Sequence, residues 1–208
     1  MSFRKIAAAA LLTLATAIAQ APLPALRIEP TSGGSVLYIK NTYTQPLTAY
    51  MIEMLDYPGS YYVLFEDMPD AQPIAAGTEL RKPISNMTVG AVPDYVKMQA
   101  AIFADGSTAG IPEKVTLLLE RRRATLAAIR ELIARVEKGQ GAAELKQWSD
   151  GLPAISRSAM RSQAAINQGV TRMMIAKASA RLGTESGEKV LAELRAMERT
   201  FAGSKPAL

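Results

Sequence analysis

The spacing of hydrophobic residues divides the chain into two differently built parts. Up to residue 111, hydrophobic side chains recur at every second position in short runs, which predicts β-strands. Turn residues separate these runs, and Pro58-Gly59 and Asp105-Gly106 are typical tight-turn pairs. From Pro112 the spacing changes to three and four residues, which predicts amphipathic helices. We therefore expect a strand-rich part at 20–111 and a helical part at 112–208.

The first part predicts an antiparallel sandwich, because its strands follow one another with no helix between them. In the second strand, Leu37 and Ile39 share one face. In the third strand, alternation places one set of side chains opposite another, namely Leu47, Ala49, Met51 and Leu55 opposite Thr48, Tyr50, Ile52 and Met54. The predicted strands are 25–28 (ended by Pro30), 36–40, 47–56, 61–66, 78–84, 96–104 and 107–110.

The second part predicts a long helix at 113–138, a short helical piece around Leu145 and Trp148, and helices at about 153–182 and 185–201. Either Ser186 or Thr184 is expected to cap the last helix. The hydrophobic seam of the long helix is interrupted by Arg122, and it is formed by Val115, Leu119, Leu126, Ile129, Ile133 and Val136. Short connections favour a helical hairpin or bundle within one chain, although a helix-mediated oligomeric scaffold is an alternative.

Two stretches carry a resemblance to known modules. The segment 36–50, with Asn41, Pro46 and Tyr50, and the segment 100–110 resemble β-sandwich modules of exported bacterial proteins. The resemblance implies an immunoglobulin-like or fibronectin-III-like fold and no activity. The expected class is α+β: an N-terminal antiparallel immunoglobulin-like β-sandwich followed by C-terminal helices.

The first 19 residues have the pattern of a cleavable signal peptide. Arg4 and Lys5 precede the hydrophobic stretch 6–18, and a small-x-small motif places the cleavage between Ala19 and Gln20. The stretch is shorter than the roughly 20 residues that span a bilayer. We therefore expect an exported protein, periplasmic or secreted, whose mature chain has no transmembrane segment.

Composition narrows the chemistry that the chain can perform. It contains no histidine and no cysteine, which excludes Ser-His-Asp and Cys-His catalysis and zinc sites of imidazole and thiolate. We find no cofactor or metal signature. Charge is also uneven: residues 20–111 carry 5 basic and 9 acidic side chains, and residues 112–208 carry 17 and 10. This asymmetry indicates docking of the two parts or an acidic partner, or only solvated helix faces.

Three acids, Glu66, Asp67 and Asp70, lie around one predicted loop. Two carboxylates held several ångströms apart can act as acid and base on a glycosidic bond, which suggests a glycan hydrolase as an alternative function. Acids in a turn more commonly form local hydrogen bonds or face solvent. The hydrolase hypothesis requires that two of these carboxylates converge in a cleft.

The densest basic feature is the arginine cluster Arg121, Arg122 and Arg123, and Arg130 follows seven residues later. It suggests an anionic partner such as an envelope polymer, while interleaved glutamates favour a salt-bridged helix face. Nucleic acid is not expected as a partner of an exported chain. The hypothesis that these features favour is a non-catalytic interaction module of the bacterial cell envelope, with an envelope protein or an anionic polymer as its partner.

Overall fold

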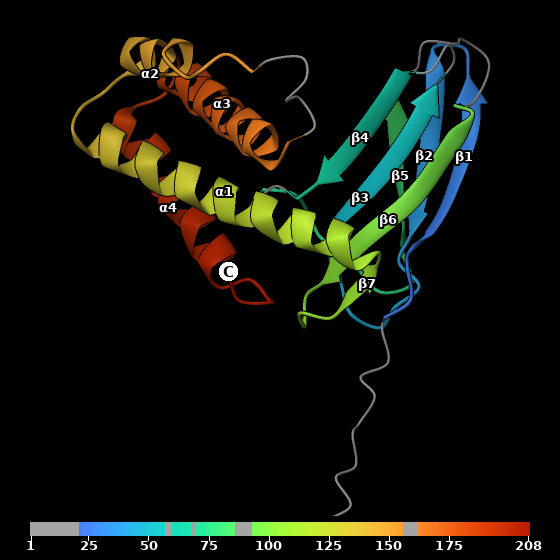
Figure 1. Cartoon of the computed structure of the whole chain (residues 1–208). Helices are drawn as coiled ribbons and strands as arrows, with labels where there is room; N and C mark the ends of the chain where they lie inside the picture. The colour runs from blue at the N-terminus through green and yellow to red at the C-terminus, as the bar shows by residue number, and fades with distance from the viewer. Residues whose placement is uncertain (1–20, 57–59, 68–69, 86–92, 156–161) are drawn as a thin grey trace, which may run out of the picture.

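The structure is a computed structural model that describes residues 21–56, 60–67, 70–85, 93–155 and 162–208. Within these residues, two antiparallel sheets are followed by four helices (Figure 1). The α+β class and the order of its two parts are therefore confirmed. The expected signal peptide, its cleavage site at Ala19 and Gln20, and the Pro58-Gly59 turn lie outside the described residues.

The strands form a three-stranded and a four-stranded sheet, and all of their pairings are antiparallel. The first sheet has the order β1-β2-β5 and contains β1 (Ala25–Thr31), β2 (Gly34–Lys40) and β5 (Glu79–Ile84). The second has the order β4-β3-β6-β7 and contains β3 (Leu47–Asp56), β4 (Ser60–Glu66), β6 (Tyr95–Phe103) and β7 (Thr108–Gly110). Among the described strands, β1, β5, β4 and β7 are therefore the sheet edges.

A hydrophobic core lies between the two sheets. It takes Leu37 and Ile39 from β2, as the alternation predicts, and Tyr50 and Ile52 from β3. The prediction for Leu47 is wrong, because this residue is also part of the core between the sheets rather than of the opposite face. A shift in the β3–β6 register between residues 47 and 49 breaks the strict alternation there.

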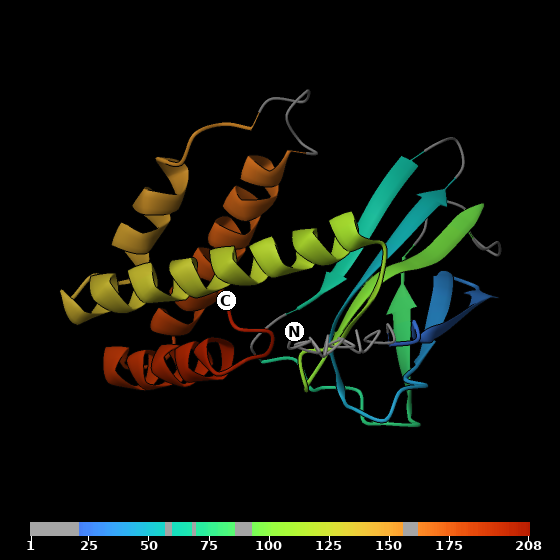
Figure 2. The ribbon, with the colours of Figure 1, turned by 60° about the horizontal axis from the view of Figure 1, so that its bottom comes forward.

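The outer face of the four-stranded sheet is covered by the first half of α1 (Pro112–Glu137). Leu118 of this helix is fully buried against the strands, in a cluster with Ala49, Met51, Ala100 and Ile102. Figure 2 shows the start of α1 beside β6 and its second half among the other helices. The helix thus extends from the sheet into the helical layer.

The second half of α1 forms a separate core with α2 (Ala142–Asp150), α3 (Gln163–Leu182) and α4 (Gly187–Ala202). Its fully buried members include Ile129 and Leu132 of α1 and Leu145 of α2. The helices therefore pack within one chain, as the short connections predict. Since α1 contributes to this core and also to the cluster on the sheet, one helix joins both parts of the protein.

Two predicted boundaries are wrong. Residues 153–155 are not helical, and α3 begins only at Gln163, where the Ser162 hydroxyl accepts a hydrogen bond from the Ala165 amide at 3.2 Å. β1 continues past Pro30 because proline is tolerated in an edge strand, where one side of the backbone needs no partner. The last helix spans Gly187–Ala202 with Ser186 as its N-cap, which confirms one of the two predicted caps.

Candidate interaction site at the sheet–helix junction

The edge of β4 differs from the other sheet edges of the described residues. β1 and β5 each contain a proline, Pro30 and Pro83, and β7 is only three residues long. Prolines and short strands are devices that protect sheet edges from pairing with another chain. β4 has seven residues and no proline, and its single charged residue, Glu66, lies at its end. It is therefore the edge best suited to accept a further strand.

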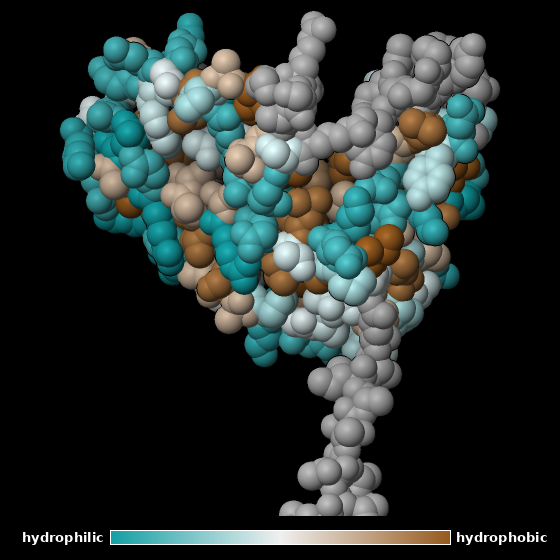
Figure 3. Space-filling view, viewed as in Figure 1, coloured by the Kyte–Doolittle hydropathy of each residue, from teal (hydrophilic) through white to brown (hydrophobic). Residues whose placement is uncertain are grey.

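Hydrophobic side chains lie beside this edge on the outer face of the sheet. Val63 and Phe65 of β4 are partly buried against the cluster that contains Leu118. The guanidinium of Arg121 lies over the Phe65 ring, 4.8 Å from its centre, in a cation–π contact. The space-filling view shows hydrophobic surface between the helical layer and the four-stranded sheet (Figure 3). The β4 edge thus adjoins a surface that is itself partly hydrophobic.

A buried ion pair lies where β4 ends. Asp67 accepts a hydrogen bond from Nε of Arg122 at 2.6 Å, and their side chains are 1% and 4% exposed. The Arg122 guanidinium also donates to the Thr48 hydroxyl of β3 at 3.0 Å and to the carbonyl of Lys205 at 3.2 Å. One arginine therefore connects the four-stranded sheet, the residue after β4, α1 and the segment after α4. Arg122 interrupts the hydrophobic seam because it fills this position.

Asp67 is only partly satisfied by its partner. Its second oxygen, Oδ2, is buried and has no hydrogen-bond partner among the described residues. Burial raises the pKa of Asp67 to about 6, while Arg122 and Arg121 oppose this shift and Glu66 adds to it. The hydroxyl of Tyr50 is likewise buried without a partner, and burial raises the pKa of this tyrosine. The end of β4 and the neighbouring core between the sheets thus each hold a buried polar atom at an electrostatic cost.

The three acids that suggested a hydrolase each pair with a different base. Glu66 forms an ion pair with Lys82 of β5, and Asp70 pairs with Lys177 of α3 at 3.0 Å. Asp67 is held by Arg122. The negative charge of Glu66 raises the pKa of Asp67, but each carboxylate has its own cationic partner. The arrangement connects the end of β4 and the loop after it to three other elements, β5, α1 and α3.

The members of the arginine cluster are also dispersed. Arg122 is buried, whereas Arg121 stacks on Phe65. Arg123 pairs with Glu120, which precedes it by one turn, and Arg130 pairs with Glu198 of α4 at 2.9 Å. The structure therefore does not bring the four guanidinium groups together on one open surface.

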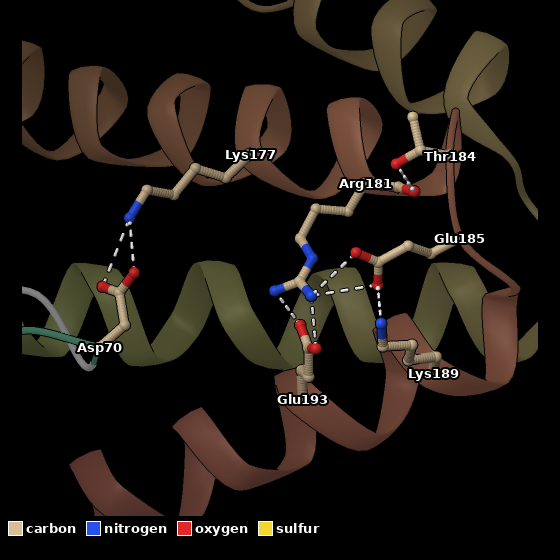
Figure 4. A network of polar contacts seen from close by, with 7 residues as sticks. All are labelled: Asp70, Lys177, Arg181, Thr184, Glu185, Lys189 and Glu193. Atoms are coloured by element: carbon tan, nitrogen blue, oxygen red, sulfur yellow. Dashed lines mark hydrogen bonds and ion pairs between the residues drawn. The ribbon is translucent and has the colours of Figure 1, made fainter.

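A concave region lies between α3 and α4. It has a volume of about 300 Å³, and its lining includes the hydrophobic residues Met174, Ala178, Val190, Leu194 and Met197. Figure 4 shows Arg181 of α3 reaching to Glu193 of α4 and to Glu185, with Lys189 beside them. The hydrogen bond from Arg181 is the main cause of the lowered pKa of Glu185. This ion-pair network crosses between the two helices and ties them together.

Sequence reasoning missed both main features of the junction. The Asp67–Arg122 pair joins residues 55 positions apart, and an arginine within a hydrophobic seam was its only signal. The position of β4 at the edge of the described sheet depends on strand order, which alternation alone does not specify. The prolines at positions 30 and 83 would have been a usable signal once the order was known.

Comparison with family models, with curated proteins and with solved structures finds no match to this chain. The described part of the chain holds no cluster of three or more side chains suited to bind a metal ion. Nor does any helix in the same residues have the length and hydrophobicity needed to cross a membrane. The geometry of the junction is therefore the main basis for a functional proposal.

Proposed function

We propose that this chain is an exported, non-catalytic interaction module of the bacterial cell envelope that binds an extended segment of a partner protein along the edge of β4. The observation that carries the proposal is the difference between β4 and the other edges. β4 has neither proline nor an interior charge, while each of the other described edges is short or contains a proline.

Strand addition explains how such an edge would recognise a partner. An incoming segment would gain affinity from main-chain hydrogen bonds to β4 and specificity from alternate side chains. On the outer face, those side chains would meet Val63, Phe65 and the aliphatic part of Arg121. The expected ligand is therefore an extended peptide with hydrophobic residues at every second position.

The arrangement of the sheets supports an immunoglobulin-like classification, which we infer as part of the same proposal. In a constant-type immunoglobulin domain, the first, second, fifth and fourth strands share one sheet. Here the first, second and fifth strands do so, and the fourth lies beside the third in the other sheet. A change of sheet by one strand therefore relates the two topologies, and it also makes β4 an edge.

Export is part of the proposal because of the sequence pattern of residues 1–19. A glycan hydrolase is less well supported, since the three acids are each engaged by a separate base. An anionic polymer is a less suitable partner than a peptide, because Arg122 is buried and Arg123 and Arg130 are paired with glutamates.

Site-specific photo-crosslinking in the native envelope tests the proposal. A photoreactive phenylalanine analogue is introduced at Tyr61 of β4 and, as a matched aromatic replacement, at Tyr38 in the central strand β2. We expect adducts from position 61 that are absent from position 38. A synthetic peptide taken from the crosslinked region should then slow amide exchange along β4.

Three outcomes contradict the proposal. Adduct formation that is equal at both positions would show non-specific contact, and absence of adducts at position 61 would show that the edge is free in the envelope. Adducts with a second copy of the chain would replace the heterologous partner by self-association, which light scattering would reveal as a doubled mass.

A further inference from the structure

The Asp67–Arg122 pair contacts several elements, so a change in the charge of Asp67 would affect the packing of all of them. Arg122 distributes its donors between Asp67, Thr48 and the Lys205 carbonyl. A cavity of about 230 Å³ adjoins the pair, and it is lined by residues of β3, of the loop after β4, of α1, of the end of α4 and of the segment after it. The pair therefore lies between the sheet, the long helix and residues 203–205.

Oδ2 of Asp67 is the atom at which a proton would bind. Oδ1 accepts the hydrogen bond from Arg122, whereas Oδ2 is buried with neither water access nor a described partner. An ionised carboxylate is stabilised when both of its oxygens accept hydrogen bonds. A carboxylate with one such oxygen unsatisfied is correspondingly easier to protonate.

The charged groups around Asp67 come from several elements. Arg122 and Arg121 of α1 favour the ionised form, and Glu66 of β4 favours the protonated form. Glu66 is itself paired with Lys82 of β5. Lys205 lines the adjoining cavity.

We propose that Asp67 is a proton-binding residue that makes the packing of the sheet, α1 and residues 203–205 around Arg122 dependent on pH, with the packing tighter in acid than at neutral pH.

The direction of this pH dependence follows from the pKa of Asp67 in the closed and in the open or unfolded state. When the junction opens or the chain unfolds, Asp67 returns to water, where its pKa is near the ordinary 3.8, whereas in the closed junction burial raises its pKa to about 6. The closed state then binds the proton more tightly, so the contribution of Asp67 to stability is complete below about pH 4. This contribution is lost as the pH rises through 6. The pKa difference of about two units corresponds to about a 100-fold change in the unfolding equilibrium.

Denaturant unfolding of the full chain between pH 4 and pH 7.5 tests the proposal with two variants. Asp67→Asn is a neutral replacement that keeps an oxygen for Arg122, and Asp70→Asn removes an exposed acid of the same loop. Relative to Asp67→Asn, the unfolding constant of the unmodified chain should rise by about 50-fold from pH 4 to pH 7. The Asp70→Asn variant should follow the unmodified chain.

Parallel curves for the unmodified chain and Asp67→Asn would overturn the proposal, as would a change of the opposite sign. A measurement on the unmodified chain covers the case in which Asp67→Asn does not fold. Amide exchange of Gly203 and Ser204, corrected for its intrinsic pH dependence, should be slower at pH 5 than at pH 7.5. Equal or faster corrected exchange at pH 5 would also overturn the proposal.

Discussion

Gly110 offers the sharpest test of how α1 is attached to the sheet. This glycine ends β7, two positions before α1, and its φ is +103°. A Cβ atom at this position would lie 2.2 Å from the carbonyl oxygen of Gln99 and 2.9 Å from Cα of Ala100. Both are backbone atoms of β6, the strand that pairs with β7. The Gly110→Ala substitution therefore requires the two strands to separate.

The expected cost has two parts. A positive φ costs an L-residue about 1–2 kcal/mol. Separation of the strands also breaks backbone hydrogen bonds between β6 and β7 and the bond from the Ile111 amide to the Gln99 carbonyl. Each of these bonds contributes about 1 kcal/mol. We expect Gly110→Ala to destabilise the fold by more than about 4 kcal/mol, which is exceptional for one substitution.

Gly139 provides the matched control. It follows α1 with a φ of +80°, and a Cβ there would meet nothing within 4 Å. Gly139→Ala should therefore cost only the backbone part, about 1–2 kcal/mol. Urea unfolding followed by circular dichroism measures both variants. Equal costs for the two substitutions would refute the argument that close approach to β6 requires glycine at position 110.

Three further substitutions test the buried pair, the helical core and one helix cap. Arg122→Met leaves Asp67 buried without its cation and should cost about 3–5 kcal/mol in urea unfolding, and adding Asp67→Leu should recover most of this loss. Leu132→Ala opens a cavity in the helical core and should cost about 3–5 kcal/mol, with an unchanged denaturant slope. Ser186→Ala removes the cap of α4 and should lower stability by about 1 kcal/mol, and a loss below 0.3 kcal/mol would show that the cap is dispensable.

Local pattern was a good guide to the elements but a poor guide to their contacts. Alternation of Leu37 and Ile39 identified the inner face of β2, because one side of that strand is wholly buried. The helix predicted at about 153–182 begins too early, because the N-cap that α3 uses is Ser162. Leu47 was misplaced because a register shift leaves no signature in hydrophobicity.

The candidate site was less predictable for a different reason. The sequence marks Asp67 as a candidate catalytic acid and Arg122 as part of a candidate anion-binding cluster. Their pairing depends on how α1 crosses the sheet, and that crossing is determined by packing of Leu118 on β3 and β6. Contacts between distant residues of this kind follow from tertiary structure and not from spacing along the chain.

The continuity of α1 also limits how the chain can change in length. Each residue added to an α-helix turns everything beyond it by about 100° and advances it by about 1.5 Å. An insertion or deletion between Leu118 and Ile129 would rotate one buried face out of phase with the other, because these residues belong to different cores. Loops elsewhere can gain or lose residues without this penalty. We therefore expect the middle of α1 to tolerate substitutions better than insertions or deletions.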